Sequence, residues 1–458
     1  MQRRDFLFHT GALAGSAALG QLGILASRAG AADAAAADAA AADGYKALVC
    51  IFLYGGNDSN NMIVPVDAAG YSAYAQIRSS IALPQSQLLP LQEPAGVLRY
   101  GLHPSLPGLQ GLWNAGNLAV VANVGTLVQP LTKAQYLLGT TQKPATLFSH
   151  IDQQHEWQAA ISDKSSNTGW GGRLSDQLNS LNAGANVPPM ISTGGNNLFV
   201  TGAASQALVI PVSGSFGLSG FSNSAADAAR RSALVQLLSL DRGADLTAAA
   251  QDVVTEALSS SATLNPILTA INSTVSQAFS ALATTNFSQQ MLAIAKVIEA
   301  HSSLGAQRQV FLATIGSFDT HTNQVNRQQT LFQQMDPVLA AFQSAMAAIG
   351  AAANVTTFTL SDFSRTLQAN TGGGTDHAWG SHHMVMGGAV HGGQIYGMMP
   401  DLALGGPDDA GGEGRWIPTI AVDQYAATLA SWFGADATAL AAVLPNLAAF
   451  SPSTLSFV

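Results

Sequence analysis

The stretch from Thr359 to Gly393, TLSDFSRTLQANTGGGTDHAWGSHHMVMGGAVHGG, concentrates the chemistry of this chain. Only 10% of the 458 residues are charged, yet these 35 residues hold four of the ten His and two Asp, Asp362 and Asp376. The stretch continues a run of apolar and β-branched residues that starts at Val355 and predicts a buried strand. Polar side chains that follow a buried strand are typical of the carboxyl edge of an open α/β sheet, where such proteins place their sites.

Two other segments have the same form. The apolar run that starts at Val310, VFLATIGSFDTH, ends in Asp319 and His321. The run KALVCIFLY from Lys46 leads into Gly55-Gly56-Asn57-Asp58. The chain therefore carries metal-ligand side chains at the ends of three predicted strands, although Asp58 taken alone is equally compatible with a helix cap.

The remaining pattern predicts an α/β fold, a central and mostly parallel sheet sandwiched by helices. Further strands are expected at 118–124, within 188–212 (PPMIS, NNLFV, ALVIPV) and at 383–390, and helices at 146–161, 322–350 and 423–434. Pro337 is expected to kink or split the helix at 322–350. Residues from about 202 to 302 form a mainly helical insertion in a single α/β domain that spans 44–458.

Composition excludes some function classes. The net charge is −9, and no basic patch is visible, so nucleic acid is not expected as a partner. The single cysteine, Cys50, excludes a disulfide within the chain and a zinc site built on cysteines. Nothing in the sequence indicates an oligomeric state.

The N-terminus predicts export. Arg3-Arg4-Asp5-Phe6-Leu7 matches the twin-arginine pattern, and a weakly apolar segment with several glycines leads to an A-x-A-like cleavage site at 29–31. A membrane anchor is the alternative, but the glycines make this segment poorly hydrophobic for a spanning helix. Residues 1–31 are therefore expected to be a cleaved signal peptide recognised by the twin-arginine translocase, and 32–43 an Ala/Asp-rich linker. The mature protein would be periplasmic or secreted.

Side chains at the three strand ends predict a metal site. They are carboxylates and imidazoles, the ligand types of Zn²⁺ and similar divalent ions. The candidates are Asp58, Asp319, His321, Asp362 and one or more of His377, His382 and His383. At most one of the neighbours His382 and His383 would face the site if they lie in a strand. Two metals held in this way can activate a nucleophile and stabilise a leaving oxygen in phosphoryl or sulfuryl transfer.

Three further residues are candidates for catalysis. Ser149 falls in the first turn of the helix expected at 146–161, where the helix dipole favours a nucleophile or a bound anion. Arg365 has the planar donors that hold phosphate, sulfate or carboxylate, and Arg173 could also hold an anion. The alternatives are a capped surface helix for Ser149 and salt bridges to acids for the two arginines, with Asp362 as the partner of Arg365.

These segments occur in a characteristic order. They are Arg3–Leu7, the strand that ends in Gly55–Asp58, Ser149-His150, Gly169–Arg173 (GWGGR), Phe318–His321, Ser361–Thr366, Gly374–His377, MGGAVHGG and DQYAATLASWFG. In this order the chain resembles the bacterial domain-of-unknown-function 1501 family along nearly its full length. That family is grouped with the alkaline phosphatase-like (sulfatase) superfamily. The resemblance implies a mostly parallel sheet between helices, with a metal site at strand carboxyl ends.

The resemblance also implies roles for particular residues. The implied metal ligands are Asp58, Asp319, His321, Asp362 and either His377 or His382. The implied cofactor is a divalent metal, zinc first, with manganese, magnesium or calcium as alternatives. Ser149 is the preferred match to the nucleophile, and Thr126 is the alternative.

The chain departs from the superfamily pattern at two points. The superfamily usually spaces the Asp and His of the first pair by three residues, whereas Thr320 alone separates Asp319 from His321. It usually has a His after the later Asp, where this chain has Phe363. One ligand of a two-metal set is therefore missing or replaced.

The function expected from the sequence is an exported metal-dependent hydrolase of phosphate or sulfate esters. Its substrate would be a small anionic ester or a component of the cell envelope. The alternative is a non-catalytic exported binding or assembly protein that retains the fold with an incomplete metal site, as the two departures suggest. A third possibility is a metal-bearing site that binds a carbohydrate or cell-wall ligand without hydrolysis.

Overall fold

A central sheet organises the molecule. The computed structural model describes residues 44–458, except 95, 97, 163–165, 215, 218–223 and 241–244. The signal peptide and linker expected at 1–43 therefore lie outside the described residues. The strands are β1 (Lys46–Leu53), β2 (Ile63–Pro65), β3 (Leu89–Gln92), β4 (Leu98–Leu102), β5 (Leu118–Gly125), β6 (Met190–Ser192), β7 (Leu208–Val209), β8 (Arg308–Ile315), β9 (Val355–Ser361), β10 (Ser381–Met386), β11 (Ile395–Tyr396) and β12 (Ile420–Ala421).

The sheet is mostly parallel, which confirms the fold class expected from the sequence. Its order is β11-β5-β10-β9-β1-β8-β6-β7, with β12 also paired to β5, and β2, β3 and β4 form a separate small sheet. The central strand β1 pairs in parallel with β8 and β9. Only β10 runs antiparallel, between β5 and β9, among the described strands of the large sheet. The carboxyl ends of β1, β8 and β9 therefore meet at one edge.

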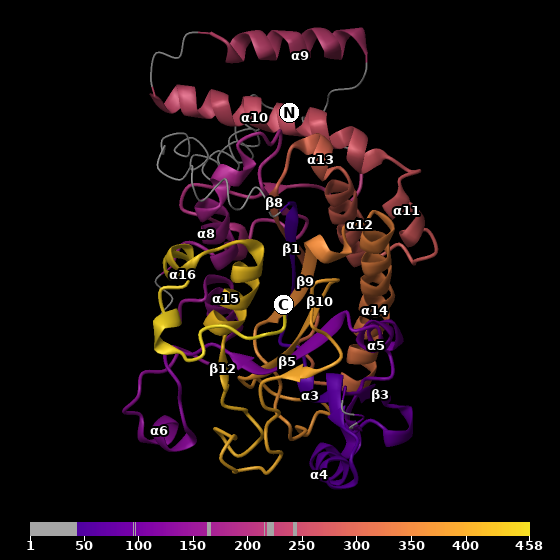
Figure 1. The fold of residues 1–458 in the computed structure, drawn as a ribbon, viewed down its shortest axis with the longest axis vertical. Helices are drawn as coiled ribbons and strands as arrows, with labels where there is room; N and C mark the ends of the chain where they lie inside the picture. The colour runs from indigo at the N-terminus through magenta and orange to yellow at the C-terminus, as the bar shows by residue number, and fades with distance from the viewer. Residues whose placement is uncertain are drawn as a thin grey trace, which may run out of the picture.

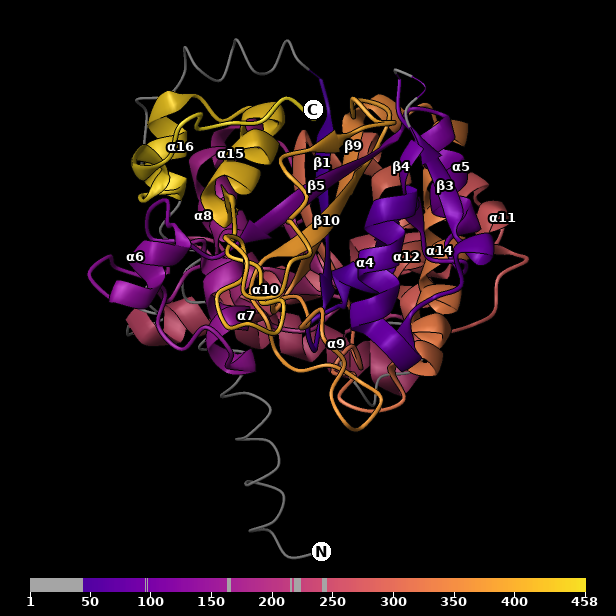
Figure 2. The same cartoon turned by 90° about the horizontal axis from the view of Figure 1, so that it is seen from below.

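Helices cover both faces of this sheet (Figure 1; Figure 2). They are α3 (Ser59–Met62), α4 (Ala68–Arg78), α5 (Pro107–Asn114), α6 (Lys133–Leu138), α7 (His150–Ala159), α8 (Trp170–Gln177), α9 (Ala225–Leu238), α10 (Asp245–Thr269), α11 (Thr274–Phe279), α12 (Asn286–Glu299), α13 (His301–Leu304), α14 (Gln324–Ala348), α15 (Val422–Phe433) and α16 (Ala437–Val443). Figure 2 shows α5, α11, α12 and α14 on one side of the sheet, and α8, α15 and α16 on the other.

Strand β1 is apolar from Ala47 to Leu53 because this part is buried on both faces. Val49 and Ile51 belong to the core with α12 and α14, and Leu48, Cys50 and Phe52 to the core with α8 and α15. Such double burial explains why its sequence lacks the polar alternation of a half-exposed strand.

The segment between β7 and β8 is helical. It contains α9 to α13, and Figure 1 places α9 and α10 at the end of the molecule opposite α3, which follows β1. None of the helices within the described ranges has the length and apolarity that a membrane span requires.

Three local expectations differ from the structure. The NNLFV segment is not a strand, because Leu198–Val200 form a short 3₁₀ helix. Pro337 does not split the predicted helix, since α14 continues through it for 25 residues. In addition, the expected strand at 383–390 begins two residues earlier and ends at Met386.

The turn after β1 requires its two glycines. Gly55 and Gly56 both have positive φ, at 112° and 79°. A Cβ on Gly55 would lie 2.5 Å from the backbone nitrogen of Asp319, and one on Gly56 would lie 2.5 Å from the ring of Phe363. The glycines therefore let the end of β1 approach the segments that follow β8 and β9.

Asp58, expected to bind metal, lies instead in a buried ion pair. It caps α3, and its carboxylate accepts hydrogen bonds from Arg78 at 2.6 and 2.8 Å, as well as from Gln324. Asp58 and Arg78 are almost completely buried. The carboxylate oxygens are thus engaged by protein donors, which gives Asp58 a structural role.

Asp58→Asn should destabilise the fold without removing metal. Loss of one partner leaves the Arg78 guanidinium buried and unpaired, which costs about 3–5 kcal/mol of unfolding free energy. Denaturant unfolding would measure this cost, and elemental analysis would measure metal per chain. Arg78→Met provides the matched control, because it should be similarly destabilising. A stable Asp58→Asn protein that has lost its metal would contradict the structural role.

Candidate functional site

Three histidines converge on one carboxylate at the carboxyl edge of the sheet. The Nε2 atoms of His321, His150 and His377 lie 3.1, 3.6 and 3.7 Å from Oδ1 of Asp319. Asp319 and His321 follow β8, His150 begins α7, and His377 lies in the loop between β9 and β10. We call these four residues the histidine cluster. It contains three groups of the kind that hold a metal ion, with ligand atoms of His150, Asp319 and His377 all within 4.8 Å of one another.

Each imidazole is oriented through its other ring nitrogen. The Nδ1 atom of His150 lies 2.7 Å from Oδ2 of Asp362, and that of His321 lies 2.9 Å from Oδ1 of Asp376. The Nδ1 atom of His377 lies 2.7 Å from the carbonyl oxygen of Phe148. A carboxylate or carbonyl oxygen only accepts hydrogen bonds, so these contacts place a proton on Nδ1 of each ring, and in the neutral tautomer of that kind Nε2 carries none. The Nε2 lone pairs then point into the cluster.

This arrangement leaves acceptors facing one another. The Nε2 atoms of His321 and His377 are 3.0 Å apart, although neither carries a proton in the assigned tautomers. The Nε2 atom of His150 is buried and has no hydrogen-bond partner among the described residues. A cation among three imidazole lone pairs and a carboxylate would remove both conflicts. Nitrogen and oxygen donors of this kind, with their outer nitrogens held by oxygens, fit Zn²⁺.

Arg365 fixes the position of Asp319. Its buried guanidinium donates hydrogen bonds to Asp319, to the carbonyl oxygens of Gly55 and Gly56, and to that of Thr375. Desolvation acts to raise the pKa of Asp319, but the hydrogen bond and positive charge of Arg365, with His321 and His150 acting in the same direction, lower that pKa overall. The carboxylate therefore stays ionised, as a metal ligand must be. Because Arg365 is occupied in this way, its donors are directed at the protein and not at a substrate anion.

Phe363 lies under the cluster. Its ring centroid is 4.6 Å from that of His377, with an angle of 30° between the two rings, and 4.8 Å from that of His150. Phe363 therefore packs against the imidazoles at a position where it can supply no ligand. Burial also lowers the pKa of His377, with the charges of Arg365, His150 and His321 acting in the same direction.

The two candidate nucleophiles differ in their surroundings. Ser149 is the N-cap residue of α7, is partly exposed, and its side chain makes no capping hydrogen bond. It lies between Phe148, whose carbonyl oxygen contacts His377, and His150, which belongs to the cluster. Thr126 is fully buried, and its hydroxyl donates a hydrogen bond of 2.7 Å to Gln153.

Three other residues expected at the site lie elsewhere or act indirectly. Asp362 is fully buried and accepts hydrogen bonds from His150, Gln154 and the backbone nitrogen of Gly55, so it supports a ligand. His382 is buried in β10, where its Nδ1 accepts from the backbone of Asn123, and burial lowers its pKa to about 4.

Arg173 does not hold an anion in this structure. Its guanidinium donates to the carbonyl oxygens of Ala159, Thr168 and Val443, and burial lowers its pKa to about 10. It therefore ties α8 to neighbouring segments.

Of the residues expected to bind metal, the structure brings together Asp319, His321 and His377. His150 completes the cluster but was considered in the sequence only as the neighbour of Ser149. The sequence places His150 in the first turn of a predicted helix. Nothing in the sequence indicates that it would meet Asp319, which lies 169 residues later. His382 and His383, of which at most one was expected to face the site, both lie outside the histidine cluster, since His382 accepts from the backbone of Asn123 and His383 packs between Trp157 and Tyr425.

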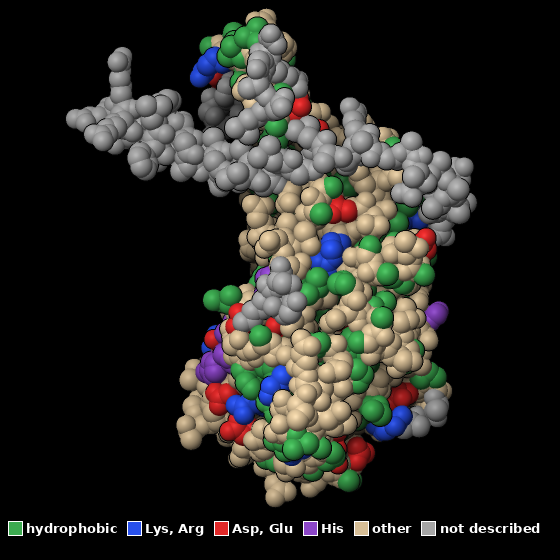
Figure 3. Space-filling view, turned by 90° about the vertical axis from the view of Figure 1, so that its left-hand side faces the viewer, with side chains coloured by type: hydrophobic (Ala, Val, Ile, Leu, Met, Phe, Trp, Pro, Cys, Tyr) green, Lys and Arg blue, Asp and Glu red, His purple; other side chains and the backbone are tan. Residues whose placement is uncertain are grey.

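The cluster is open to solvent on one side. His150, His321 and Asp319 have side-chain exposures of 27%, 41% and 45%, enough for a small molecule to reach them. Figure 3 shows His side chains beside acidic and basic ones at the surface of the lower half of the molecule. The loop with Asp319 and His321 begins at Ser317 and ends at Asn323, which both have positive φ. For Ser317, at 76°, this backbone conformation is uncommon.

Comparison with solved structures found distant similarities. The chain resembles the lipoteichoic acid synthase LtaP from Listeria monocytogenes with 9% identity and a TM-score of 0.31, covering 87% of this chain and 74% of that one. It resembles the C-terminal periplasmic domain of EcEptC from Escherichia coli, in complex with Zn, with 11% identity and a TM-score of 0.30, covering 76% and 74%. It resembles the PsFucS1 sulfatase from Pseudoalteromonas sp. with 11% identity and a TM-score of 0.31, covering 80% and 68%. Similarities of this size carry no argument about activity.

Comparison with protein families gives a clear assignment. The curated proteins contain no match to this chain. A family model described as "Protein of unknown function (DUF1501)" matches residues 45–410, which include every residue of the histidine cluster. The chain belongs to the DUF1501 family.

Proposed function

We propose that this protein is a hydrolase of phosphate or sulfate esters that holds one divalent metal ion in the histidine cluster. The observation that carries the proposal is the convergence of three imidazole Nε2 atoms on Asp319, with two of them 3.0 Å apart. Each ring is held by an oxygen at Nδ1, so the lone pairs cannot turn away from one another without loss of a hydrogen bond.

The proposed ligands are His150, Asp319 and His377, with His321 as the fourth. When bound, a divalent ion in such a site supplies Lewis-acid stabilisation of charge on phosphoryl or sulfuryl oxygens. Zinc suits the donor set best, because imidazole and carboxylate are its usual ligands and no cysteine is needed. One ion is proposed and not two, since Phe363 packs where the superfamily pattern has a His, and Asp58 is engaged by Arg78.

The residues of the chain itself would prepare the site in two ways. Asp362 and Asp376 hold His150 and His321 in the Nδ1-protonated tautomer, which keeps Nε2 available as a ligand. Arg365 keeps Asp319 ionised and prevents it from rotating, because the same guanidinium is bound to Gly55 and Gly56. These contacts pre-organise the cluster before substrate arrives.

Ser149 is the proposed nucleophile. Its Oγ would form a bond to phosphorus or sulfur while the bond to the ester oxygen breaks, and the hydroxyl proton would end on the departing oxygen, which leaves as the alcohol. Water would then attack the covalent intermediate, regenerate the hydroxyl and release phosphate or sulfate. The partial exposure of Ser149 and its freedom from a capping bond support this role over that of the buried Thr126.

A specific observation favours a second candidate, a binding protein without turnover. The donors of Arg365 and Arg173 are directed at protein oxygens, which leaves neither arginine to hold a substrate anion. Retention of metal in the absence of turnover on every ester tested would support this alternative against the hydrolase.

We expect close to one tightly bound divalent ion per chain. Elemental analysis of purified protein would measure it, and His150→Ala and Asp319→Ala should each lose most of the ion because each removes a ligand. A saturating metal at about 100 times its Kd should also stabilise the wild type by about 2.7 kcal/mol. His391→Gln is the matched control, because His391 is exposed and outside the cluster. Two ions per chain, or an unchanged ion content in both alanine variants, would sink the proposed site.

Ser149→Ala should abolish most turnover while metal content is retained. Removal of a nucleophile lowers kcat by on the order of 10³-fold or more. Steady-state kinetics on aryl phosphate and aryl sulfate esters would measure the loss, with Thr126→Ala as comparison. If Ser149→Ala kept wild-type kcat on an ester that the wild type hydrolyses, another group would have to be the nucleophile.

We also propose export by the twin-arginine pathway, on the basis of Arg3, Arg4 and the cleavage pattern at 29–31. Replacement of both arginines by lysine should leave the protein in the cytoplasmic fraction. The exported wild-type protein should begin at Ala32 when its N-terminus is measured by mass spectrometry. Export of the double-lysine variant at the wild-type level would rule this pathway out.

A further inference from the structure

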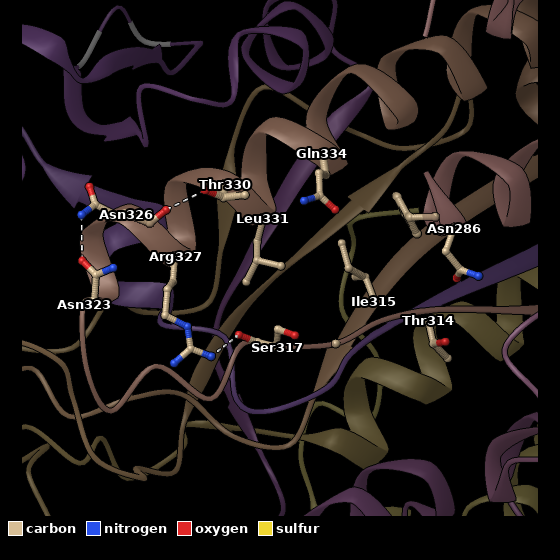
Figure 4. Close-up of a pocket in the computed structure, with 12 residues that line it drawn as sticks. Asn286, Thr314, Ile315, Ser317, Asn323, Asn326, Arg327, Thr330, Leu331 and Gln334 are labelled. Carbon is tan, nitrogen blue, oxygen red and sulfur yellow. Dashed lines mark hydrogen bonds between the residues drawn. The ribbon is translucent and has the colours of Figure 1, made fainter. Parts of the chain in front are cut away.

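A cavity of about 570 Å³ lies at the carboxyl end of β8, the strand that Asp319 and His321 of the histidine cluster follow. Its walls come from the carboxyl end of β8, the first residues of α14 and the start of α12 (Figure 4). This volume is within the range of about 300–1,000 Å³ that is usual for small-molecule sites. None of its lining residues belongs to the histidine cluster.

The lining is polar but almost uncharged. Four carboxamides contribute to it, and they are Asn286, Asn323, Asn326 and Gln334. Three hydroxyl residues also line it, and they are Thr314, Ser317 and Thr330. Carboxamides both donate and accept hydrogen bonds, as do hydroxyls, so the lining matches a ligand with many hydroxyl groups. No acidic residue contributes to the lining.

Part of the cavity wall is apolar. Phe287, Ile315 and Leu331 contribute to the lining and are buried. A ligand that fits this cavity therefore needs an apolar face as well as hydroxyl groups, a combination that sugar rings have. A ligand made only of charged groups would leave these side chains without a partner.

One cation stands at the cavity without a carboxylate partner. Within the described ranges, the guanidinium of Arg327 makes one long hydrogen bond, 3.4 Å from its Nη2 to the carbonyl oxygen of Ser317 (Figure 4). In the described part of the chain, no carboxylate lies within 4 Å of it. A partly exposed, unpaired guanidinium favours a ligand with a negative group.

The cavity is joined to the cluster by the chain itself. Ser317 lines the cavity and Asp319 belongs to the cluster, so their Cα atoms are separated by at most about 7 Å. Ser317, whose backbone is left-handed, lies where the chain leaves β8 and turns from the cavity to the histidine cluster. A ligand larger than one ring could therefore contact both.

We infer that this cavity binds a saccharide that carries a negative group, with its hydroxyls on the carboxamides and its anion on Arg327. The inference deepens the proposed function and rests on it in one respect, namely that such a saccharide carries the ester to be cleaved. Binding in the cavity itself requires no metal and no turnover. The negative group is a carboxylate or an ester anion, and the cavity chemistry is the same for both.

The test is calorimetric binding of two disaccharides without an ester bond, cellobiose and its glucuronate counterpart cellobiouronic acid. The acidic sugar should bind at least about tenfold more tightly at low salt, because it gains a charge-assisted hydrogen bond to Arg327. Arg327→Met should reduce its affinity to that of cellobiose. Gln334→Leu should weaken both sugars, since it removes a donor and an acceptor that they share.

Arg99→Met is the matched control. Arg99 is an exposed arginine outside the cavity, paired with Glu93 at 3.2 Å, and its replacement should leave the affinity for both sugars unchanged. Failure of the wild type to bind either sugar at millimolar concentration would overturn the inference. Equal binding of the acidic sugar by the wild type and Arg327→Met would also overturn it.

The two proposals fail in different experiments. Turnover of small aryl esters without saccharide binding would refute only the saccharide site. Saccharide binding with no metal and no ester turnover would refute the hydrolase and leave a saccharide-binding protein.

Discussion

One buried guanidinium holds together the carboxyl edge of the central sheet, where the histidine cluster lies. Arg365 is fully buried, and a charge in such a place is tolerated only when it is paired and hydrogen-bonded. Its partners come from segments that follow β1, β8 and β9, namely the carbonyls of Gly55 and Gly56, the carboxylate of Asp319 and the carbonyl of Thr375. Three strand ends are therefore fixed relative to one another by a single side chain, and the histidine cluster takes its shape from that constraint.

The cluster itself is built from weak local signals that become specific only in three dimensions. His150, His321 and His377 come from three separate segments, and each depends on a different oxygen to orient its ring. The glycine pair after β1 makes room for Asp319 on one side and Phe363 on the other. Phe363 then packs against two of the three imidazoles, which limits the number of ligands that can gather there.

The sheet could be predicted well from the sequence, because apolar runs rich in β-branched residues usually form buried strands. Strands β1, β5, β8 and β9 were all expected, and so was the concentration of polar side chains after β1, β8 and β9. Long-range partners were not predictable. Nothing local shows that Asp58 would meet Arg78, or that Asp362 would hold His150 from 212 residues away and thereby become a support and not a ligand. Whether a carboxylate at a strand end binds metal depends on which donors reach it, and that is decided by packing.

The position of β1 at the centre of the sheet also has a consequence for biosynthesis. This strand is the first of the sheet to leave the ribosome, but Lys46 pairs with Arg308, which is made 262 residues later, and Ala47 pairs with Val355. At about 5–20 residues per second, the strand waits roughly 10–50 s for its first neighbour. During that time the apolar residues 47–53 have both strand edges unpaired, which exposes the nascent chain to pairing with other chains until β8 and β9 have been translated.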